Sequence, residues 1–320
     1  MNRAAQGNLV WRLTAMAVIL CATVAVPTLG ADSPFSWVDQ DGALRLMYEG
    51  KPLLQYNYEP VKQPEGVAEA FARSAYIHPV WNTAGQIVTD DFPRDHYHQR
   101  GVFFAWTKTE FGDLHPDFWN LGTRSGRIVF EAFEGRSTGA DSAELVVRHR
   151  WEASRDGKWE LVLRERWTLR AHVPEAGAPD HWILDLTSRQ ECATETPLVL
   201  PQYFYGGMAY RGHHDWIANK AAVTVLTSEG HDRAAADETN ARWCMMGGPL
   251  DGGWGGVTIM DHPSNVRFPN RLRVHPGVPY FGFMLPQAEA YTIAPGQALV
   301  LQYRIVVHAK MPDAAFLNGL

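Results

Sequence analysis

The alternation of apolar and polar residues is the feature that most limits how this chain can fold. Between residues 159 and 170, Leu161 and Leu163 fall on one face of an extended segment, while Arg164 and Arg166 fall on the other. This period of two is typical of half-buried antiparallel strands. It recurs along the chain with turn residues at short intervals, whereas helical periodicity is nearly absent. The pattern predicts an all-β protein, built as one large antiparallel β-sandwich.

The first residues predict export. Arg3 and Arg12 precede an apolar run over residues 13–26, and small residues follow that run. A helix that spans a bilayer needs about 20 apolar residues, so the run is too short and instead has the layout of a secretory signal peptide. We therefore expect a signal peptide at residues 1–31 and a single β-sandwich domain at residues 32–320. The alternative is an N-terminal anchor that is not cleaved.

Charge and cysteine content limit the partners and the cross-links. The chain has a formal net charge of -6 and no basic cluster. We therefore expect no nucleic acid partner and no integral membrane association after cleavage. Cys192 and Cys244 remain in the mature chain. Export makes a disulfide between them one alternative, and two buried free thiols are the other.

A histidine-rich motif, Asp95-His96-Tyr97-His98-Gln99-Arg100-Gly101, precedes an expected strand. In an extended segment, His96 and His98 would place their side chains on one face. Two adjacent imidazoles can bind a metal ion, or they can divide the roles of general acid and general base. The alternative is a pair of loop histidines that are hydrogen-bonded to the backbone. His78, in the segment Y-I-H-P, is a third candidate of the same kind.

Further polar and aromatic residues fall at expected strand ends and turns, where loops can converge on one rim. They are Trp119, Tyr205, Arg211, Trp243, His262 and Asn265. Aromatic residues make up 12% of the chain; their faces can stack on sugars, although most of them should fill the core. No nucleophile elbow, Walker loop, dinucleotide fingerprint or H-E-x-x-H zinc motif occurs.

Glu165 lies on the apolar face of its expected strand, between Leu163 and Trp167. A carboxylate in that place is either paired with a buried cation or held with a raised pKa for proton transfer. His149 and the arginines of the same hairpin are the candidate partners.

An ordered set of short motifs resembles the DUF6807 family, which also carries the label "methane oxygenase PmoA". The set is Y-I-H-P, D-H-x-H-x-R-G, D-F-W, Y-G-G-x-x-x-R, R-W and D-H-P-S-N-x-R-x-P, and it closes on residues 303–308. The family motif usually reads D-H-P-H-H-R-G. Here Tyr97 and Gln99 replace the proline and the second adjacent histidine, so a role of that histidine does not carry over. His96, His98 and Arg100 match.

The resemblance implies a carbohydrate substrate, because members of the family resemble exported bacterial proteins encoded among sugar oxidoreductases and isomerases. It also implies a sandwich similar to the galactose-mutarotase supersandwich. We reject methane oxidation, since that membrane subunit must cross the bilayer with several helices. After residue 30 this chain has no apolar stretch near the required length.

Residues and resemblance together predict a periplasmic or secreted bacterial enzyme that acts on a sugar or an oxidised glycoside. The expected chemistry is acid/base catalysis of the lyase, hydrolase or epimerase type. The candidate catalytic residues are His78, His96, His98 and Glu165. In the metal-assisted alternative, one divalent metal ion is the cofactor and its ligands are His78, His96 and His98. The expected substrate contacts are Arg100, Trp119, Tyr205, Arg211, Trp243, His262 and Asn265, with the arginines holding an anionic group or an oxyanion.

Two other classes of function stay open at this point. One is a carbohydrate-binding protein without turnover, and the other is a structural or interaction protein whose histidines only satisfy the core. Titratable groups gathered in a concave pocket would favour the enzyme. A flat aromatic platform with histidines elsewhere would favour the binding protein, and scattered histidines would favour the structural protein.

The signal peptide gives a direct test. Because the small residues that suit a signal peptidase follow the apolar run, the mature protein should begin between Gly30 and Ser33. N-terminal sequencing of the protein from its native host measures this. An intact Met1 on a membrane-bound form would contradict it.

Overall fold

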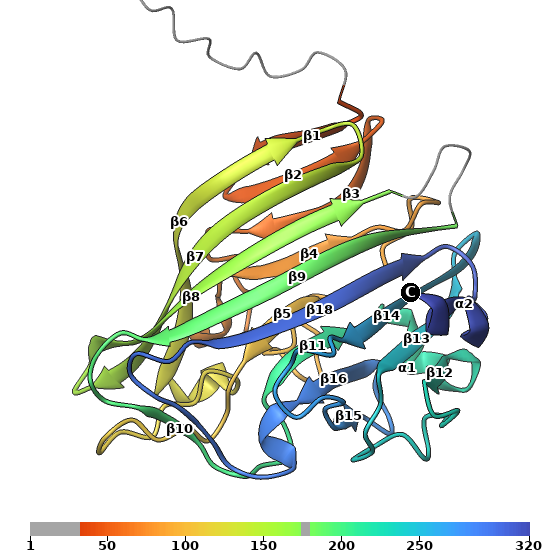
Figure 1. Ribbon diagram of the computed structural model, residues 1–320. Helices are drawn as coiled ribbons and strands as arrows, with labels where there is room; N and C mark the ends of the chain where they lie inside the picture. The colour runs from red at the N-terminus through yellow and green to blue at the C-terminus, as the bar shows by residue number, and fades with distance from the viewer. Residues whose placement is uncertain (1–32, 174–179) are drawn as a thin grey trace, which may run out of the picture. The chain divides into compact units, whose positions relative to one another are not determined.

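Two large antiparallel sheets make up the computed structural model, which describes residues 33–173 and 180–320 (Figure 1). The first sheet has the strand order β1 (Phe35–Gln40), β2 (Ala43–Tyr48), β3 (Lys51–Asn57), β4 (Tyr76–Val80), β5 (Val102–Ala105), β11 (Gly207–Arg211), β16 (Tyr280–Met284) and β15 (Leu272–Val274). The second has the order β12 (Thr224–Thr227), β13 (Trp243–Leu250), β14 (Gly253–Asp261), β18 (Leu299–His308), β9 (His181–Cys192), β8 (Lys158–His172), β7 (Ser142–Arg155) and β6 (Gly126–Thr138).

Short elements complete the described part of the chain. Strands β10 (Leu198–Leu200) and β17 (Tyr291–Ile293) form a small separate sheet. The α-helices are α1 (Asp215–Ala218) and α2 (Ala314–Gly319), and the 3-10 helices are η1 (Glu69–Phe71), η2 (Leu121–Thr123), η3 (Lys220–Ala222) and η4 (Leu285–Gln287). No helix in the described ranges has the length and apolar character to cross a membrane. The prediction of a nearly all-β antiparallel sandwich is confirmed; the predicted signal peptide lies outside the described residues.

The alternating pattern decides which side of each strand faces the core. On β8, Leu163 and Leu169 are buried, whereas Arg164 and Arg166 are exposed. Asp156 and Gly157 both have positive φ, which suits the tight turn of the β7–β8 hairpin. Inward-facing residues of both sheets form one continuous apolar core. The burial of their apolar surface drives the two sheets together.

A buried carboxylate sits inside this core. Glu165 of β8 is only 1% exposed, and its oxygens accept hydrogen bonds from the indole nitrogens of Trp151 (2.9 Å) and Trp167 (2.8 Å). Three more partners come from His149 (3.0 Å), Ser188 (2.6 Å) and Gln190 (3.1 Å). Burial raises the pKa of Glu165, but the hydrogen bond and charge of His149 outweigh it, so the net pKa lies below its ordinary value.

The same network crosses from one sheet to the other. His149 is fully buried, and its second ring nitrogen lies 2.6 Å from the hydroxyl of Tyr56 on β3. Of the two alternatives for Glu165, the structure therefore shows pairing with His149 rather than a raised pKa. Cys192 and Cys244 are both free thiols, so the disulfide alternative is not what the structure has.

Glu165→Ala should lower the free energy of unfolding by about 3–5 kcal/mol, because it leaves His149 and two indole N–H groups buried without their acceptor. Urea denaturation measures this. The matched control is Glu191→Ala on neighbouring β9, whose carboxylate is half-exposed and pairs with Arg189; its effect should stay below about 1 kcal/mol. Equal effects in the two variants would contradict a stabilising role for the network.

Candidate functional site

The histidine-rich motif lies in the loop that connects β4 to β5 at the centre of the first sheet. Here the expectation of an extended segment at His96 and His98 is wrong. The N–H of His96 donates to the carbonyl of Pro93 (2.9 Å) and the N–H of Gln99 to that of His96 (2.9 Å), so the segment consists of turns. The two rings nevertheless lie 5.5 Å apart, edge to face.

Gly101 returns this loop to the sheet. Its N–H donates to the carbonyl of Asp90 (2.9 Å), and its own carbonyl accepts the N–H of Arg211 (2.7 Å) on β11. Gly101 has positive φ, and a Cβ there would collide with the carbonyl oxygen of Ile77. Only glycine fits this position without a shift of the backbone. The last residue of the motif therefore fixes the loop against β4 and β11.

Arg100 is fully buried, and each of its three guanidinium nitrogens has a hydrogen-bond partner inside the protein. It pairs with Asp91 and donates to the carbonyl of Phe71 (2.9 Å) and the hydroxyl of Tyr76 (2.5 Å). Its guanidinium also lies over the ring of Phe92, 3.5 Å from the centroid. The substrate contact expected at Arg100 stays a prediction; the contacts observed here tie Arg100 to Asp91, Phe71 and Tyr76.

Arg211 is also fully buried, and it holds the other side of the loop. Its guanidinium donates to both carboxylate oxygens of Asp95 (2.8 and 3.0 Å) and to the side chain of Gln99 (2.8 Å). Burial raises the pKa of Asp95, but the hydrogen bonds from Arg211 and His96 bring it down to about 2. Asp95 is therefore ionised at neutral pH and orients His96, whose Nδ1 lies 2.9 Å away.

One group of histidines forms around His96. Its ring lies 5.5 Å from that of His98 and 5.6 Å from that of His275, which follows β15. Burial, followed by the neighbouring His96, lowers the pKa of His98 to about 4. Burial also lowers the pKa of His275, with Arg273 and His96 adding to the effect. Both imidazoles are therefore neutral at pH 7, when they can accept a proton or bind a metal ion.

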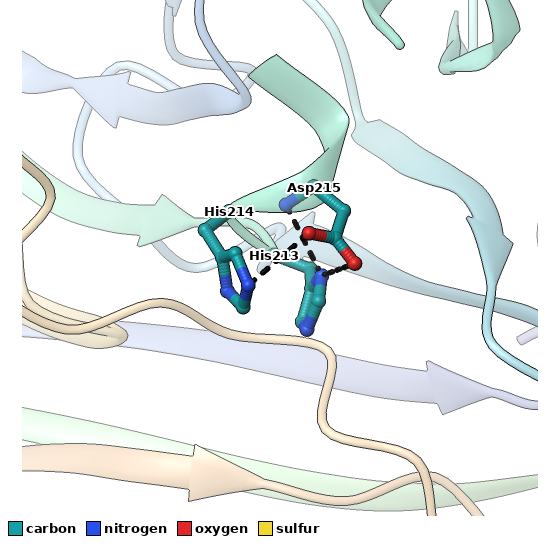
Figure 2. Close-up of side chains that lie close together, drawn as sticks. All are labelled: His213, His214 and Asp215. Carbon is teal, nitrogen blue, oxygen red and sulfur yellow. Dashed lines mark hydrogen bonds and ion pairs between the residues drawn. The ribbon is translucent and has the colours of Figure 1, made fainter. Parts of the chain in front are cut away.

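A second group lies on the other side of Arg211. His78 of β4 places Nδ1 2.9 Å from the hydroxyl of Thr89, and burial lowers its pKa to about 4 with a further contribution from His213. Figure 2 shows the rings of His213 and His214 side by side at the start of α1, with the Asp215 carboxylate next to both. His78 and Asp91 also line a cavity of about 370 Å³.

Metal-binding geometry singles out this second group. In the part of the chain that the structure describes, one set of three His, Cys, Asp or Glu residues has ligand atoms within 4.8 Å of one another, namely His213, His214 and Asp215. The predicted ligand set of His78, His96 and His98 is not such a set, and it stays a prediction.

Three aromatic rings pack against one another in a row. The ring of Trp119, which is only 2% exposed, lies 5.2 Å from that of the partly exposed Tyr205, which lies 5.0 Å from that of Tyr203. The charge of Asp117 acts on both Tyr205 and His98, so these two side chains share one charged neighbour. Burial and the hydrogen bond to Tyr203 raise the pKa of Tyr205 to about 12, so its hydroxyl keeps its proton.

The remaining predicted residues lie elsewhere. Trp243 and His262 line a cavity of about 410 Å³ beside α2, and Asn265 donates to Asp261 (2.7 Å) and to the carbonyl of Gln302 (2.7 Å). Trp243 belongs to a small apolar cluster with Leu317 of α2, separate from the main core. Glu165 lies between the sheets and is hydrogen-bonded within its own network. The residues that were expected to share one rim therefore lie in three separate parts of the structure.

Sequence reasoning missed several residues of the site, among them His275 and Asp90. His275 stands alone in the sequence and reaches His96 only because β15 lies at the edge of the first sheet. Asp90 follows Thr89 in the loop after β4, and its N–H donates to the carbonyl of Arg211 (3.2 Å). No spacing rule links either residue to the motif. The adjacent acidic residues Asp90 and Asp91, a few positions before the motif, were the one sequence feature that could have indicated Asp90.

Comparison with known proteins places this all-β chain in a family. The model of a family described as "Family of unknown function (DUF6807)" matches residues 43–320. The chain belongs to this family, so the predicted membership is confirmed, while nothing in the comparisons supports the methane oxygenase label. None of the curated proteins matches this sequence.

Solved structures give a distant likeness. The chain is similar to heparan sulfate lyase HepC from Pedobacter heparinus, with a TM-score of 0.36 and 8% identity over 88% of this chain and 36% of that one. A mutant of the same lyase gives a TM-score of 0.37. The chain thus spans little more than a third of the length of these proteins.

The neutral histidines predict a loss of stability in acid. The pKa of His98 is about 4 in the folded protein and near 6.5 in the unfolded chain, so the unfolded chain binds an extra proton between these values. The contribution of His98 to stability is therefore complete above pH 6.5 and is lost as the pH falls towards 4. The Tm of His98→Asn should fall less steeply over this range than that of the wild type.

Differential scanning calorimetry across this pH range measures the effect. His115→Asn is the matched control, because His115 is exposed and should leave the slope unchanged. An unaltered slope in His98→Asn would contradict the burial of a neutral imidazole at this position.

Proposed function

We propose that this protein is a carbohydrate-active enzyme that carries out acid/base chemistry on a sugar or an oxidised glycoside, of the lyase, hydrolase or epimerase type. The observation that carries the proposal is a neutral, partly buried His98 that shares the electrostatic influence of Asp117 with Tyr205, whose aromatic ring is partly exposed. Aromatic faces stack on the C–H faces of sugars, and a neutral imidazole accepts a proton at pH 7. The resemblance to exported bacterial proteins encoded among sugar enzymes supports the same substrate class.

The proposed division of roles follows from the charge states. His98 acts as general base, because its lone pair is free at neutral pH. His96, oriented by Asp95, passes or receives a proton next to it. Tyr205 keeps its phenolic proton and donates it as a hydrogen bond or to a leaving oxygen. Elimination, hydrolysis and epimerisation each need a base and a proton donor whose pKa values differ.

The arginines take a positioning role in this proposal. Arg100 and Arg211 are fully buried, and their hydrogen bonds go to groups of the protein. They hold the motif loop from two sides, which fixes His96 and His98 on a rigid support. His78, which lines the cavity of about 370 Å³ with Asp91, is the candidate base on the other side of Arg211. The predicted signal peptide places the reaction in the periplasm or outside the cell.

His96→Ala and His98→Ala should each abolish turnover while leaving the Tm nearly unchanged. The physical reason is that His96 is partly exposed and that the side chain of His98 has no hydrogen-bond partner among the described residues, so neither removal leaves a buried partner unpaired. The measurement is a screen of 3-keto and unmodified glycosides, with and without added divalent metal, followed by assay of the two variants on any substrate found.

His115→Ala, on an exposed histidine of another loop, serves as the control and should retain full turnover. Saturable binding of a glycoside by the wild type without any turnover would contradict the enzyme proposal and would indicate a carbohydrate-binding protein. Unfolding of both variants, with normal activity in their native fraction, would leave only a structural role for the motif.

A further inference from the structure

Backbone pairing brings a second loop segment to the start of α1. Thr89 forms an antiparallel bridge with Gly212, and the N–H of Asp90 donates to the carbonyl of Arg211 (3.2 Å). Asp90 is thereby placed beside the residues that lead directly into His213. The pairing joins two parts of the chain that are far apart in the sequence.

At this junction three donor side chains already face one another. His214 Nε2 lies 3.1 Å from Asp215 Oδ1, and His213 Nδ1 lies 3.7 Å from Asp215 Oδ2. The two imidazole rings lie 4.2 Å apart between centroids, on the same side of the chain (Figure 2). Ligand atoms around a tetrahedral zinc ion are about 3–3.5 Å apart, since each bond is about 2 Å long. The observed spacing is close to that requirement.

Asp90 supplies an independent observation. Its residue is 8% exposed, and one carboxylate oxygen, Oδ1, accepts the N–H of Asp91 (2.9 Å). The other, Oδ2, is buried and accepts no hydrogen bond from a described residue; it faces Arg211 Nε in a long ion pair of 3.9 Å. Asp90 is therefore only weakly paired. His214 is close enough to influence Asp90 electrostatically.

We propose that His213, His214 and Asp215 form a binding site for one divalent transition-metal ion of the zinc type. Two imidazoles and one carboxylate are a donor set that such ions favour, with water or a substrate completing the coordination. Asp90 is not a ligand in this proposal; its carboxylate lies near enough to His214 to add negative charge to the surroundings of the ion. This site stands apart from the carbohydrate proposal, because metal binding does not require that the substrate be a sugar.

The surroundings suit a bound metal ion. The N–H of Asp215 donates to Nδ1 of His213 (3.3 Å), which holds this ring in place at the start of α1. His78 is near enough to His213 to interact with it electrostatically, and the hydroxyl of Thr89 lies 2.9 Å from its Nδ1. His78 also lines the cavity of about 370 Å³.

The experiment uses the full mature chain, stripped with a chelator and titrated with Zn²⁺ by isothermal calorimetry. We expect one equivalent per chain, with metal analysis of the dialysed protein giving the same ratio. His214→Ala and Asp215→Asn should each raise the Kd at least tenfold, because each removes one ligand. His214 and Asp215 are both exposed, so both variants should fold; circular dichroism checks this.

Two controls make the result specific. His172→Ala removes another half-exposed histidine next to a carboxylate, that of Asp185, and should leave the Kd unchanged. His96→Ala should also leave the Kd unchanged. Absence of stoichiometric Zn²⁺ binding would overturn the proposal, as would binding that survives in His214→Ala and Asp215→Asn. Binding lost in His96→Ala but kept in His214→Ala would move the site to the motif histidines. Failure of the glycoside screen would leave this result untouched.

Discussion

The conformation of the loop between β4 and β5 depends on two buried charges, the guanidinium groups of Arg100 and Arg211, which have no solvent exposure. A charge in that position is tolerated only where carboxylates and carbonyls surround it. Asp91 and Asp95 provide the carboxylates, and both lie in the loop between β4 and β5. The ion pairs with the two arginines therefore determine the path of this loop. They also determine the positions of His96 and His98, which lie in the same loop.

Arg211 also separates two chemically different neighbourhoods. On one side, His98 is partly buried, and no carboxylate of the described residues is bonded to its ring. On the other side, His213 and His214 both face the carboxylate of Asp215. The first arrangement suits proton transfer to an organic substrate, and the second suits a cation. The histidines of this chain therefore lie in two chemically distinct environments near the same sheet.

The fold could be predicted because strand periodicity is a local property: Leu163 and Arg164 differ in polarity, and that difference decides which one is buried. The site could be predicted only in part. On β13, Trp243 and Met245 face one apolar cluster while Cys244 and Met246 face another, so alternation gives no signal for the side on which Trp243 lies. His275 meets His96 through the order of strands in the sheet, which no short-range pattern contains.

The shared carboxylate of Glu165 gives the molecule an optical property. Trp151 and Trp167 each point their N–H at this fixed negative charge, and an electric field of that strength and direction shifts the energy of an indole excited state. Their emission therefore reports whether the two sheets are closed around the charge. Trp119, packed against Tyr205 in the same core, has no carboxylate acceptor for its N–H among the described residues. A change in indole emission when Glu165 is removed would therefore come from the two tryptophans that bond it.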